Sequence, residues 1–363
     1  MNFFSVLPRY ISRSFLAHFV FLLLILLFIV YVFDFIELLN RGADHNAGFF
    51  DVMALGLYKL PEVGQVILPF AVLFSAMFTF WRLNKTSELT VMRAMGTSAL
   101  QFTVPMLITA LCLGIFATAV INPLSAVLLK KYEQQEDILF EKTSKLVSIS
   151  ENGLWLRQNA SDGYALLNAK GLNADNWTMK NLVILEMSED NKLIRRIQAK
   201  EGQLANENWQ LRDVSIFRQG PRPVRQAEYL YPTDLTPQDI VDTFTTVEVI
   251  SFWEVRNFID TLEETGFSTE RLEVYWHSLL ARPFFFAAMV LLAAAVSLRP
   301  QRQGGTTLLV LSGVFIGFFV FFSDSALQAF GISQKIPVFL AAWTPTLVSI
   351  LLGTSVILQL EDG

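Results

Sequence analysis

The sequence predicts an α-helical membrane protein with six spans, three plus three, and an all-β domain inserted between the third and fourth spans. Of its 363 residues, 53% are hydrophobic, and the mean hydropathy is +0.43, which is too apolar for an ordinary soluble protein. Six apolar runs are each long enough to cross a bilayer as a helix. Between the third and fourth runs, from about residue 130 to 271, charged and amide side chains alternate with short apolar stretches.

The first three spans are predicted near residues 15–33, 63–81 and 102–121, and the last three near 278–298, 306–322 and 337–358. Pro69 and Pro105 fall inside two of them, where neighbouring helices can satisfy the backbone groups that a proline frees. The resulting domain boundaries are 1–125 for the first three spans with a short helix near 84–100, 126–250 for the β domain, 251–270 for a connecting helix and 271–363 for the last spans.

The insert contains short, partly alternating runs bounded by Asn, Asp and Gly, at residues 153–157, 164–169, 182–187, 193–199 and 209–217. This spacing is typical of an all-β sandwich or jelly roll. The pattern then changes to that of an amphipathic helix. Ser251 and Glu254 form a potential capping box, Gly266 can end the helix, and apolar residues recur at helical spacing between them: Phe252, Val255, Phe258, Ile259 and Leu262.

Basic residues in the short loops predict the orientation in the membrane. One side collects Arg9, Arg13, Arg82, Lys85, Arg93, Arg299 and Arg302, whereas the other side's short loops hold only Arg41, Lys59 and Lys335. The first side is therefore expected to be cytoplasmic, with both termini inside. The β domain is then expected outside, away from any ATP.

No pattern of catalytic or metal-binding residues appears in the sequence. It has no phosphate-binding Gly-x-x-x-x-Gly-Lys-Ser/Thr loop, no nucleophile elbow and no metalloprotease motif, and its histidines (His18, His45 and His277) are scattered. Cys112 is the single cysteine, and the net charge of −5 comes without a basic stripe, so neither a disulfide nor a nucleic-acid partner is expected. Ionisable residues within the spans, Asp34, Arg282 and Asp324, fall toward the outer ends. We therefore expect neither a catalytic site nor transport driven by a proton or sodium gradient.

The most informative segment on the inner side is residues 84–100, NKTSELTVMRAMGTSAL. Helical spacing puts Leu89, Met92 and either Met95 or Gly96 on one face, while Glu88 and Arg93 stay accessible. Two interpretations remain open from the spacing. The segment is either a loop helix lying on the membrane or a coupling helix that docks into a cytoplasmic motor subunit.

Ser87-Glu88-Leu89, Val91-Met92 and Ala94-Met95-Gly96 resemble the S-E-[IL]-x-V-M-x-A-x-G signature of the lipopolysaccharide export permeases, the LptF/LptG (YjgP/YjgQ) family. Further short motifs resemble those of the family and occur in the same order along essentially the whole chain: Arg9-Tyr10, Leu68-Pro69, Asn122-Pro123, Gly153-Leu154-Trp155, Gly313, Gly317-Phe318, Gly331-Ile332 and Pro337. The segments Trp276 to Pro283 and Asp324 to Pro337 look closer to the LptG branch than to the LptF branch.

The resemblance implies a permease subunit, not an enzyme, in the inner membrane of a Gram-negative bacterium. Family members pair as an LptF–LptG heterodimer over an LptB ATPase dimer, which uses the ATP. The complex extracts lipopolysaccharide and passes it through periplasmic jelly rolls to LptC and a periplasmic bridge toward the outer membrane. The first and fifth spans line a lateral opening, here about residues 15–36 and 306–324. Acyl chains leaving the bilayer need a continuous apolar trough, which suits an open jelly roll.

The resemblance also implies roles for individual residues. Glu88 matches the acidic position that pairs with a basic group on the ATPase, and Leu89, Met92, Arg93 and Gly96 complete the expected coupling site. Lipid-contact candidates are Arg41, Arg282, Phe318 and Asp324. Gly313 and Gly317 are expected to let helices pack closely. The chain departs from LptG-type sequences by carrying Asp34 and Glu37, not basic residues, at the outer end of the first span.

Three other functions compete with this one. A permease of the lipoprotein-release type would place its large outer domain after the first span, whereas three spans come first here. A membrane scaffold or assembly protein would hold a β domain without an ATPase partner. A membrane enzyme acting on lipid would need clustered titratable groups. We therefore favour the exporter.

Overall fold

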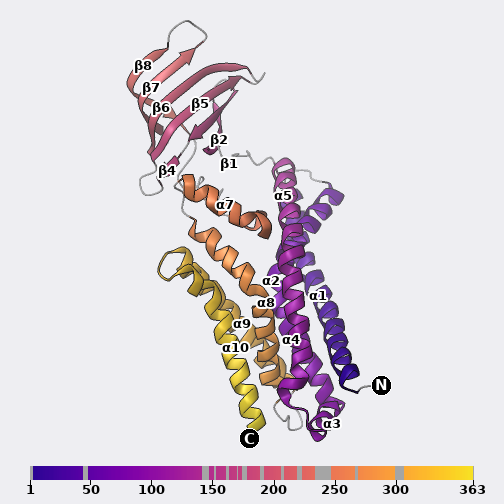
Figure 1. Ribbon diagram of the computed structural model, residues 1–363. Coiled ribbons are helices and arrows are strands. Elements are labelled where there is room, and N and C mark those ends of the chain that lie inside the picture. The colour runs from indigo at the N-terminus through magenta and orange to yellow at the C-terminus, as the bar shows by residue number, and fades with distance from the viewer. Residues whose placement is uncertain are drawn as a thin grey trace. The chain divides into compact units, whose positions relative to one another are not determined.

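A computed structural model describes residues 3–43, 48–140, 147–150, 153–160, 163–169, 171–173, 178–188, 192–205, 208–218, 223–233, 247–265, 269–298 and 306–362 (Figure 1). His45, Gly266, Arg299 and Arg302, on which some predictions depend, lie outside these ranges. The chain divides into a helical unit (Met1–Glu141, Glu248–Trp253 and Glu270–Gly363) and a β unit (Lys142–Val247 and Glu254–Thr269).

The described part of the helical unit contains six helices that are long and apolar enough to cross a membrane, as predicted. They are α1 (Phe3–Ala43), α2 (Phe49–Lys85), α4 (Ala99–Phe116) continued by the π-helical η1 (Ala117–Ile121) and α5 (Asn122–Leu139), α8 (Glu270–Ser297), α9 (Thr306–Ile332) and α10 (Val338–Asp362). The 41 residues of α1 extend about 60 Å, roughly twice the hydrocarbon thickness, so helices continue beyond the bilayer. The third span in particular stays helical to Leu139, past residue 126.

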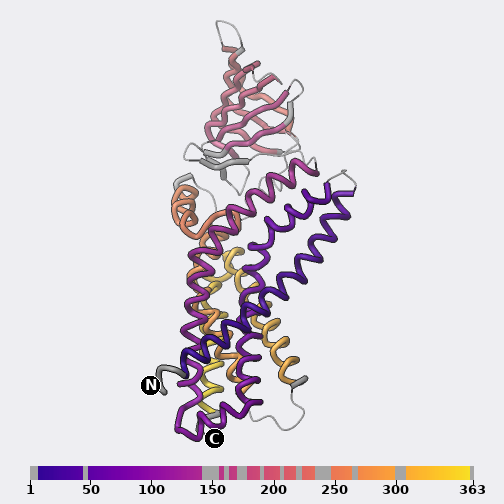
Figure 2. Tube along the Cα trace, turned by 90° about the vertical axis from the view of Figure 1, so that its right-hand side faces the viewer, coloured from indigo at the N-terminus to yellow at the C-terminus, as the bar shows by residue number. Residues whose placement is uncertain are grey.

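Helix α8 is the centre of the helical unit and packs against α2, α4, α9 and α10. Its sequence from Ala287 to Ala295 is rich in alanine, and small side chains let neighbouring helices approach closely. Phe15, Phe80, Phe102 and Phe286 fill the core around it, whereas α1 and α9 leave most of their large apolar side chains exposed, as lipid-facing helices do. In both views α1 lies beside α2 (Figure 1 and Figure 2).

Prolines in two spans leave carbonyl groups that neighbouring segments satisfy. Pro123 has no N–H to offer the Ala119 carbonyl one turn earlier, and that carbonyl accepts from the indole Nε1 of Trp253 at 3.3 Å. Pro283 likewise leaves the Leu279 carbonyl of α8 free, and the hydroxyl of Thr118 in η1 donates to it at 3.1 Å. Side chains from neighbouring segments therefore satisfy the carbonyls that both prolines free, and the π-helical turn supplies one of these donors, Thr118.

The β unit contains one antiparallel sheet of eight strands in the described residues: β1 (Val147–Ser150), β2 (Gly153–Ala160), β3 (Gly163–Ala169), β4 (Gly171–Asn173), β5 (Thr178–Ser188), β6 (Leu193–Ala205), β7 (Asn208–Arg218) and β8 (Val224–Pro232). The strand order is β1-β2-β3-β5-β6-β7-β8, and the short β4 also pairs with β5 (Figure 1). This confirms the predicted all-β insert between the third and fourth spans.

The register of the sheet builds one continuous apolar row. Leu156 pairs with Leu167, Leu167 with Ile184, Ile184 with Ile197, and Ile197 with Ile216, and all five side chains are buried. Such cross-strand pairs are what stabilises a sheet, and a one-residue slip would turn the whole row outward.

The sheet also curls, so that strands far apart in its order come together. Gln158 of β2 donates from Nε2 to the Pro232 carbonyl of β8 at 3.1 Å, and the Thr233 hydroxyl donates to Gln158 Oε1 at 2.7 Å. Near this closure, burial and the neighbouring Glu186 carboxylate raise the pKa of Tyr231, and Arg195 donates from Nη2 to Glu186 Oε1 at 2.6 Å. The result is a rolled sheet with an apolar interior.

Helix α7 (Phe252–Thr265) follows the β strands. Val255, Ile259 and Leu262 are buried while Trp253, Glu254 and other residues on the opposite side are exposed, which confirms the predicted amphipathic helix. The Ser251 and Glu254 capping box stays a prediction.

Candidate functional sites in the helical unit

The sequence signature folds into a short helix, α3 (Glu88–Ala94), at the end of the helical unit where α1 begins and α10 ends (Figure 1). It follows α2 after a tight turn at Ser87, whose φ of 60° is left-handed. Glu88 is held by two hydroxyl groups, from Thr86 Oγ1 at 2.9 Å and from Tyr10 at 3.4 Å. The carboxylate is therefore positioned at the first turn of α3 while remaining partly exposed.

The apolar residues of α3 divide between two faces, and the division differs from the predicted docking face. Leu89 and Met92 are only 3% exposed and pack into the core of the helical unit, because α3 covers the end of the bundle. Val91 and Met95 are 56% and 50% exposed. The outward apolar face therefore consists of Val91 and Met95, with Arg93 exposed beside them.

Gly96 ends α3 in a Schellman motif. Its φ is +82°, its N–H donates to the Arg93 carbonyl at 2.9 Å, and the N–H of Thr97 donates to the Met92 carbonyl at 3.2 Å. Residues with a side chain rarely adopt this left-handed conformation. The backbone therefore requires a glycine at position 96 whether or not a partner binds here. The next helix starts at once, with a capping box between Ser98 and Gln101.

Arg41 and Asp34, at the outer end of α1, each pair with an oppositely charged residue of a neighbouring helix. Arg41 donates to Glu136 of α5 at 2.8 Å, and its guanidinium lies over the Phe140 ring. Asp34 lies 3.9 Å from the ammonium of Lys59. Arg41, a predicted lipid contact, is thus already paired with a carboxylate of its own chain.

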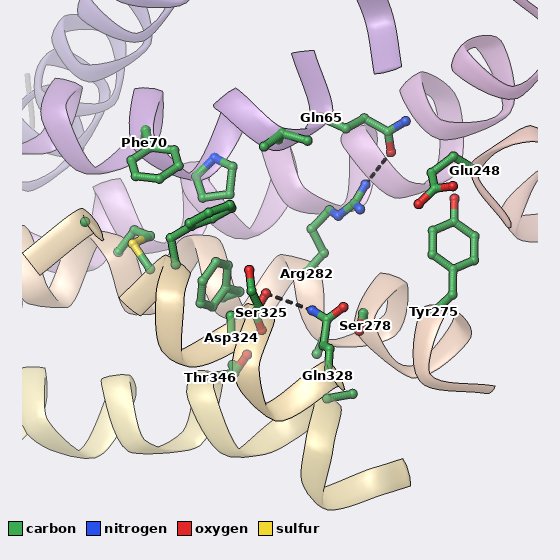
Figure 3. Close-up of a pocket in the computed structure, with 18 of the residues that line it drawn as sticks. Gln65, Phe70, Glu248, Tyr275, Ser278, Arg282, Asp324, Ser325, Gln328 and Thr346 are labelled. Carbon is green, nitrogen blue, oxygen red and sulfur yellow. Dashed lines mark hydrogen bonds between the residues drawn. The ribbon is translucent and has the colours of Figure 1, made fainter. Parts of the chain in front are cut away.

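Arg282 and Asp324, the two other charged lipid-contact candidates, line one cavity of about 400 Å³. Arg282 of α8 donates from Nη1 to Gln65 Oε1 of α2 at 2.6 Å, and Asp324 of α9 accepts from Gln328 Nε2 at 2.8 Å (Figure 3). Phe318, in contrast, is 65% exposed on α9 and is not part of this lining.

Asn122 connects three elements beside this cavity and was not among the predicted site residues. Its Nδ2 donates to Gln65 Oε1 at 3.2 Å and to the Tyr275 hydroxyl at 2.7 Å, while its Oδ1 accepts from the Phe252 N–H at 2.8 Å. The Asn-Pro pair at the end of the third span was the only sequence feature that pointed here. The buried amide ties α2, α8 and the start of α7 together.

The two glycines of α9 lie against α2. A Cβ on Gly313 would come within 2.5 Å of Met77 Sδ, and one on Gly317 would lie 3.1 Å from Leu73 Cδ2. Both positions therefore allow a close approach of the two helices, in keeping with the predicted packing role.

Comparison with known proteins gives the same family along the whole chain. A sequence model of the lipopolysaccharide export system permease LptF/LptG family matches residues 9–359. The lipopolysaccharide export system permease protein LptG of Escherichia coli (strain K12) is 22% identical over 355 residues, which cover 94% of this chain and 95% of that protein. LptG of Haemophilus influenzae is 21% identical, covering 96% and 97%, and LptF of Escherichia coli (strain K12) is 24% identical, covering 98% and 95%.

Both permease types are thus among the relatives, at similar identity, and each aligns over at least 94% of this chain. Together with the six spans and the inserted β unit, this match shows that the chain belongs to the LptF/LptG family of lipopolysaccharide export system permeases.

Proposed function

We propose that this chain is a permease subunit that extracts lipopolysaccharide from the inner membrane and passes it to a periplasmic bridge toward the outer membrane. The observation that carries the proposal is the family match over residues 9–359. The rolled sheet with its apolar interior suits the transfer of acyl chains through water, because apolar surface is stabilised when it leaves water.

The energy comes from ATP hydrolysed by a separate cytoplasmic LptB-like ATPase dimer that docks at α3. Glu88 is partly exposed at the first turn, and Val91, Arg93 and Met95 form the outward surface. An acidic group beside two exposed apolar side chains fits a groove on a partner that is apolar and carries a basic residue. Leu89 and Met92 support this surface from beneath.

The other proposed partners are a homologous permease subunit of the LptF type and an LptC-like protein that receives the lipid. The chain itself is assigned to the LptG branch on the segments Trp276 to Pro283 and Asp324 to Pro337. Both termini and α3 face the cytoplasm, and the β unit faces the periplasm. The excess of Lys and Arg in the loops on the α3 side supports this orientation.

Purification of the tagged chain from its native membrane, followed by mass spectrometry of the bound proteins, tests the proposal. The wild type is expected to retain a nucleotide-binding subunit and a second permease of similar topology. Glu88→Lys is expected to lose the nucleotide-binding subunit and keep the second permease. Glu254→Lys carries the same charge change on an exposed first turn of α7 and should behave as the wild type.

Recovery of the wild-type chain alone, under conditions that preserve other membrane complexes, would favour a scaffold and contradict the exporter. Retention of the nucleotide-binding subunit by Glu88→Lys would contradict the coupling role of α3 while leaving the exporter assignment intact.

A further inference from the structure

The cavity between α2, α8, α9 and α10 has a lining that is unusually polar for the interior of a membrane-spanning bundle. One guanidinium, that of Arg282, faces it together with the carboxylates of Glu62, Glu248 and Asp324. Charged groups within spans are costly and are rarely kept without a role. At about 400 Å³ the cavity is also of the size that small ligands occupy.

Arg282 has hydrogen-bonding capacity that the chain does not use. A guanidinium carries five N–H donors, and within the described residues it makes one hydrogen bond, to Gln65 Oε1 at 2.6 Å. Asp324 lines the same space but is bound by Gln328, not by Arg282 (Figure 3). Arg282 therefore lacks an acceptor of the strength that a buried cation requires, and a phosphate oxygen would supply it.

The carboxylates oppose a purely anionic ligand. Glu62 and Glu248 carry no hydrogen bond among the residues that the structure describes, and Glu248 lies beside the Tyr275 hydroxyl (Figure 3). With three acids against one arginine, a phosphate alone would meet repulsion. A ligand that carries a phosphate and a primary ammonium would satisfy both halves of the lining.

The depth of the cavity matches the level of lipid headgroups. At 1.5 Å per residue, Arg282 lies about 22 Å from the end of α8, Asp324 about 27 Å from the start of α9, and Gln65 about 30 Å from the end of α2. These three ends lie toward α3 in the bundle (Figure 1 and Figure 2). The hydrocarbon core is about 30 Å thick, so the polar lining lies near the headgroups of the leaflet opposite α3.

The cavity also has an apolar mouth. Val66 of α2 and Phe321 of α9 both line it and are 50% and 41% exposed, so it opens on the surface of the bundle between these helices. Phe70 and Phe321 face each other there with ring centroids 5.5 Å apart. A lipid could keep its acyl chains along this aromatic and aliphatic edge while its headgroup lies inside.

We propose that this cavity binds a lipid headgroup made of a phosphodiester and a primary ammonium, as in phosphatidylethanolamine. Arg282 holds the phosphate, and Asp324, Glu62 and Glu248 hold the ammonium. A phosphoethanolamine group occurs either in a glycerophospholipid or as a substituent of lipopolysaccharide, and both would present the same chemistry. The site is additional to the proposed export function and does not depend on it.

Native mass spectrometry of the purified full-length chain, in the complex with which it is isolated, tests the site. Phosphatidylethanolamine, phosphatidylglycerol and phosphatidylcholine with identical acyl chains are added at equal concentration. The wild type is expected to retain phosphatidylethanolamine about tenfold more than either competitor, since one charged hydrogen bond is equivalent to about that factor. Arg282→Gln should lower retention about tenfold, and the isosteric Asp324→Asn should lower the preference over phosphatidylglycerol.

Arg256→Gln is the matched control, because it removes an exposed guanidinium of α7 that is paired with Asp260 and does not line the cavity. Competition by lipopolysaccharide with, but not without, phosphoethanolamine would assign the headgroup to that lipid, and no competition would assign it to the phospholipid. Equal retention of phosphatidylglycerol, unchanged retention in both cavity variants, or no bound lipid in the wild type would overturn the proposal. Complex assembly, measured on the same samples, reports on the export function separately.

Discussion

At the scale of single residues, Thr118 shows how the bundle tolerates prolines inside its spans. Its hydroxyl donates to the Leu279 carbonyl, which Pro283 cannot bind, across an interface between η1 and α8. In the hydrocarbon core of the membrane no water is available to hydrogen-bond a carbonyl that the protein leaves unsatisfied. The side chain is buried, so water cannot replace it from outside the bundle either.

Thr118→Val should therefore destabilise the chain by about 1 kcal/mol, because it keeps the side-chain volume and removes the donor. Thr103→Val is the control, since Thr103 is equally buried but donates to Ala99 within its own helix. In a Pro283→Ala background residue 283 regains its N–H, so the cost of Thr118→Val should fall. Unfolding in a detergent titration, followed by circular dichroism, gives the values, and an unchanged cost in that background would contradict the mechanism.

The contacts of single residues were the features that the sequence predicted least well. Glu88 was identified from a signature, and Arg282 and Asp324 were marked as ionisable residues near the outer ends of spans. Their common cavity was not foreseeable, because Gln65, Arg282 and Asp324 are brought together only by the packing of three helices. Asn122 was missed for the same reason, since its partners lie 57, 130 and 153 residues away.

At the scale of elements, α4 and α8 approach so closely that no side chain fits at Gly114. A Cβ there would lie 2.4 Å from Pro283 Cα and 3.0 Å from its nitrogen, which are backbone atoms that cannot move aside. The comparable position on α9, Gly313, faces the flexible end of Met77. The α4 and α8 contact is therefore the more rigid of the two.

Gly114→Ala is expected to destabilise the helical unit by about 1 to 3 kcal/mol, the usual cost of overpacking, and Gly313→Ala clearly less. Thermal unfolding of the two variants, purified side by side in one detergent, compares them directly. An equal or larger loss for Gly313→Ala would show that the α2 and α9 contact, not the α4 and α8 contact, limits how closely these helices pack.

Most helices and strands were predictable from the sequence, because the spacing and length of an apolar run indicate which element it forms. The five predicted strands lie within β2, β3, β5, β6 and β7, and the spans were placed correctly although their helices extend further. Strand β8 was missed, since all of its residues except Tyr229 and Tyr231 are exposed and an edge strand of this kind shows no alternation. Spacing grouped Leu89 and Met92 with Met95 or Gly96, whereas the structure buries Leu89 and Met92 and exposes Met95, because spacing alone cannot tell which face of a short helix packs against its own protein.

At the scale of the whole molecule, orientation decides whether the β unit can meet a periplasmic partner. The predicted orientation has a direct test, because Cys112 is the single native cysteine. In a Cys112→Ser background, Lys200→Cys places a thiol on an exposed position of β6, and Thr90→Cys places one on an exposed position of α3.

A maleimide that cannot cross the inner membrane should label Lys200→Cys in cells with a permeabilised outer membrane and leave Thr90→Cys unlabelled until the inner membrane is opened. The reverse pattern would place the β unit in the cytoplasm and exclude transfer of lipid to a periplasmic acceptor.

In the proposed function, ATP hydrolysis in a partner subunit, transmitted through α3, drives lipopolysaccharide out of the membrane by way of this chain. The most direct measurement reconstitutes the chain with the subunits recovered alongside it and follows ATP-dependent release of lipopolysaccharide from proteoliposomes to a soluble acceptor. We expect release with the wild type and with Glu254→Lys, and a loss to the level without ATP with Glu88→Lys. Release by Glu88→Lys at the wild-type rate would contradict the coupling role of α3, and no ATP-dependent release by the wild-type complex would contradict the proposed export function.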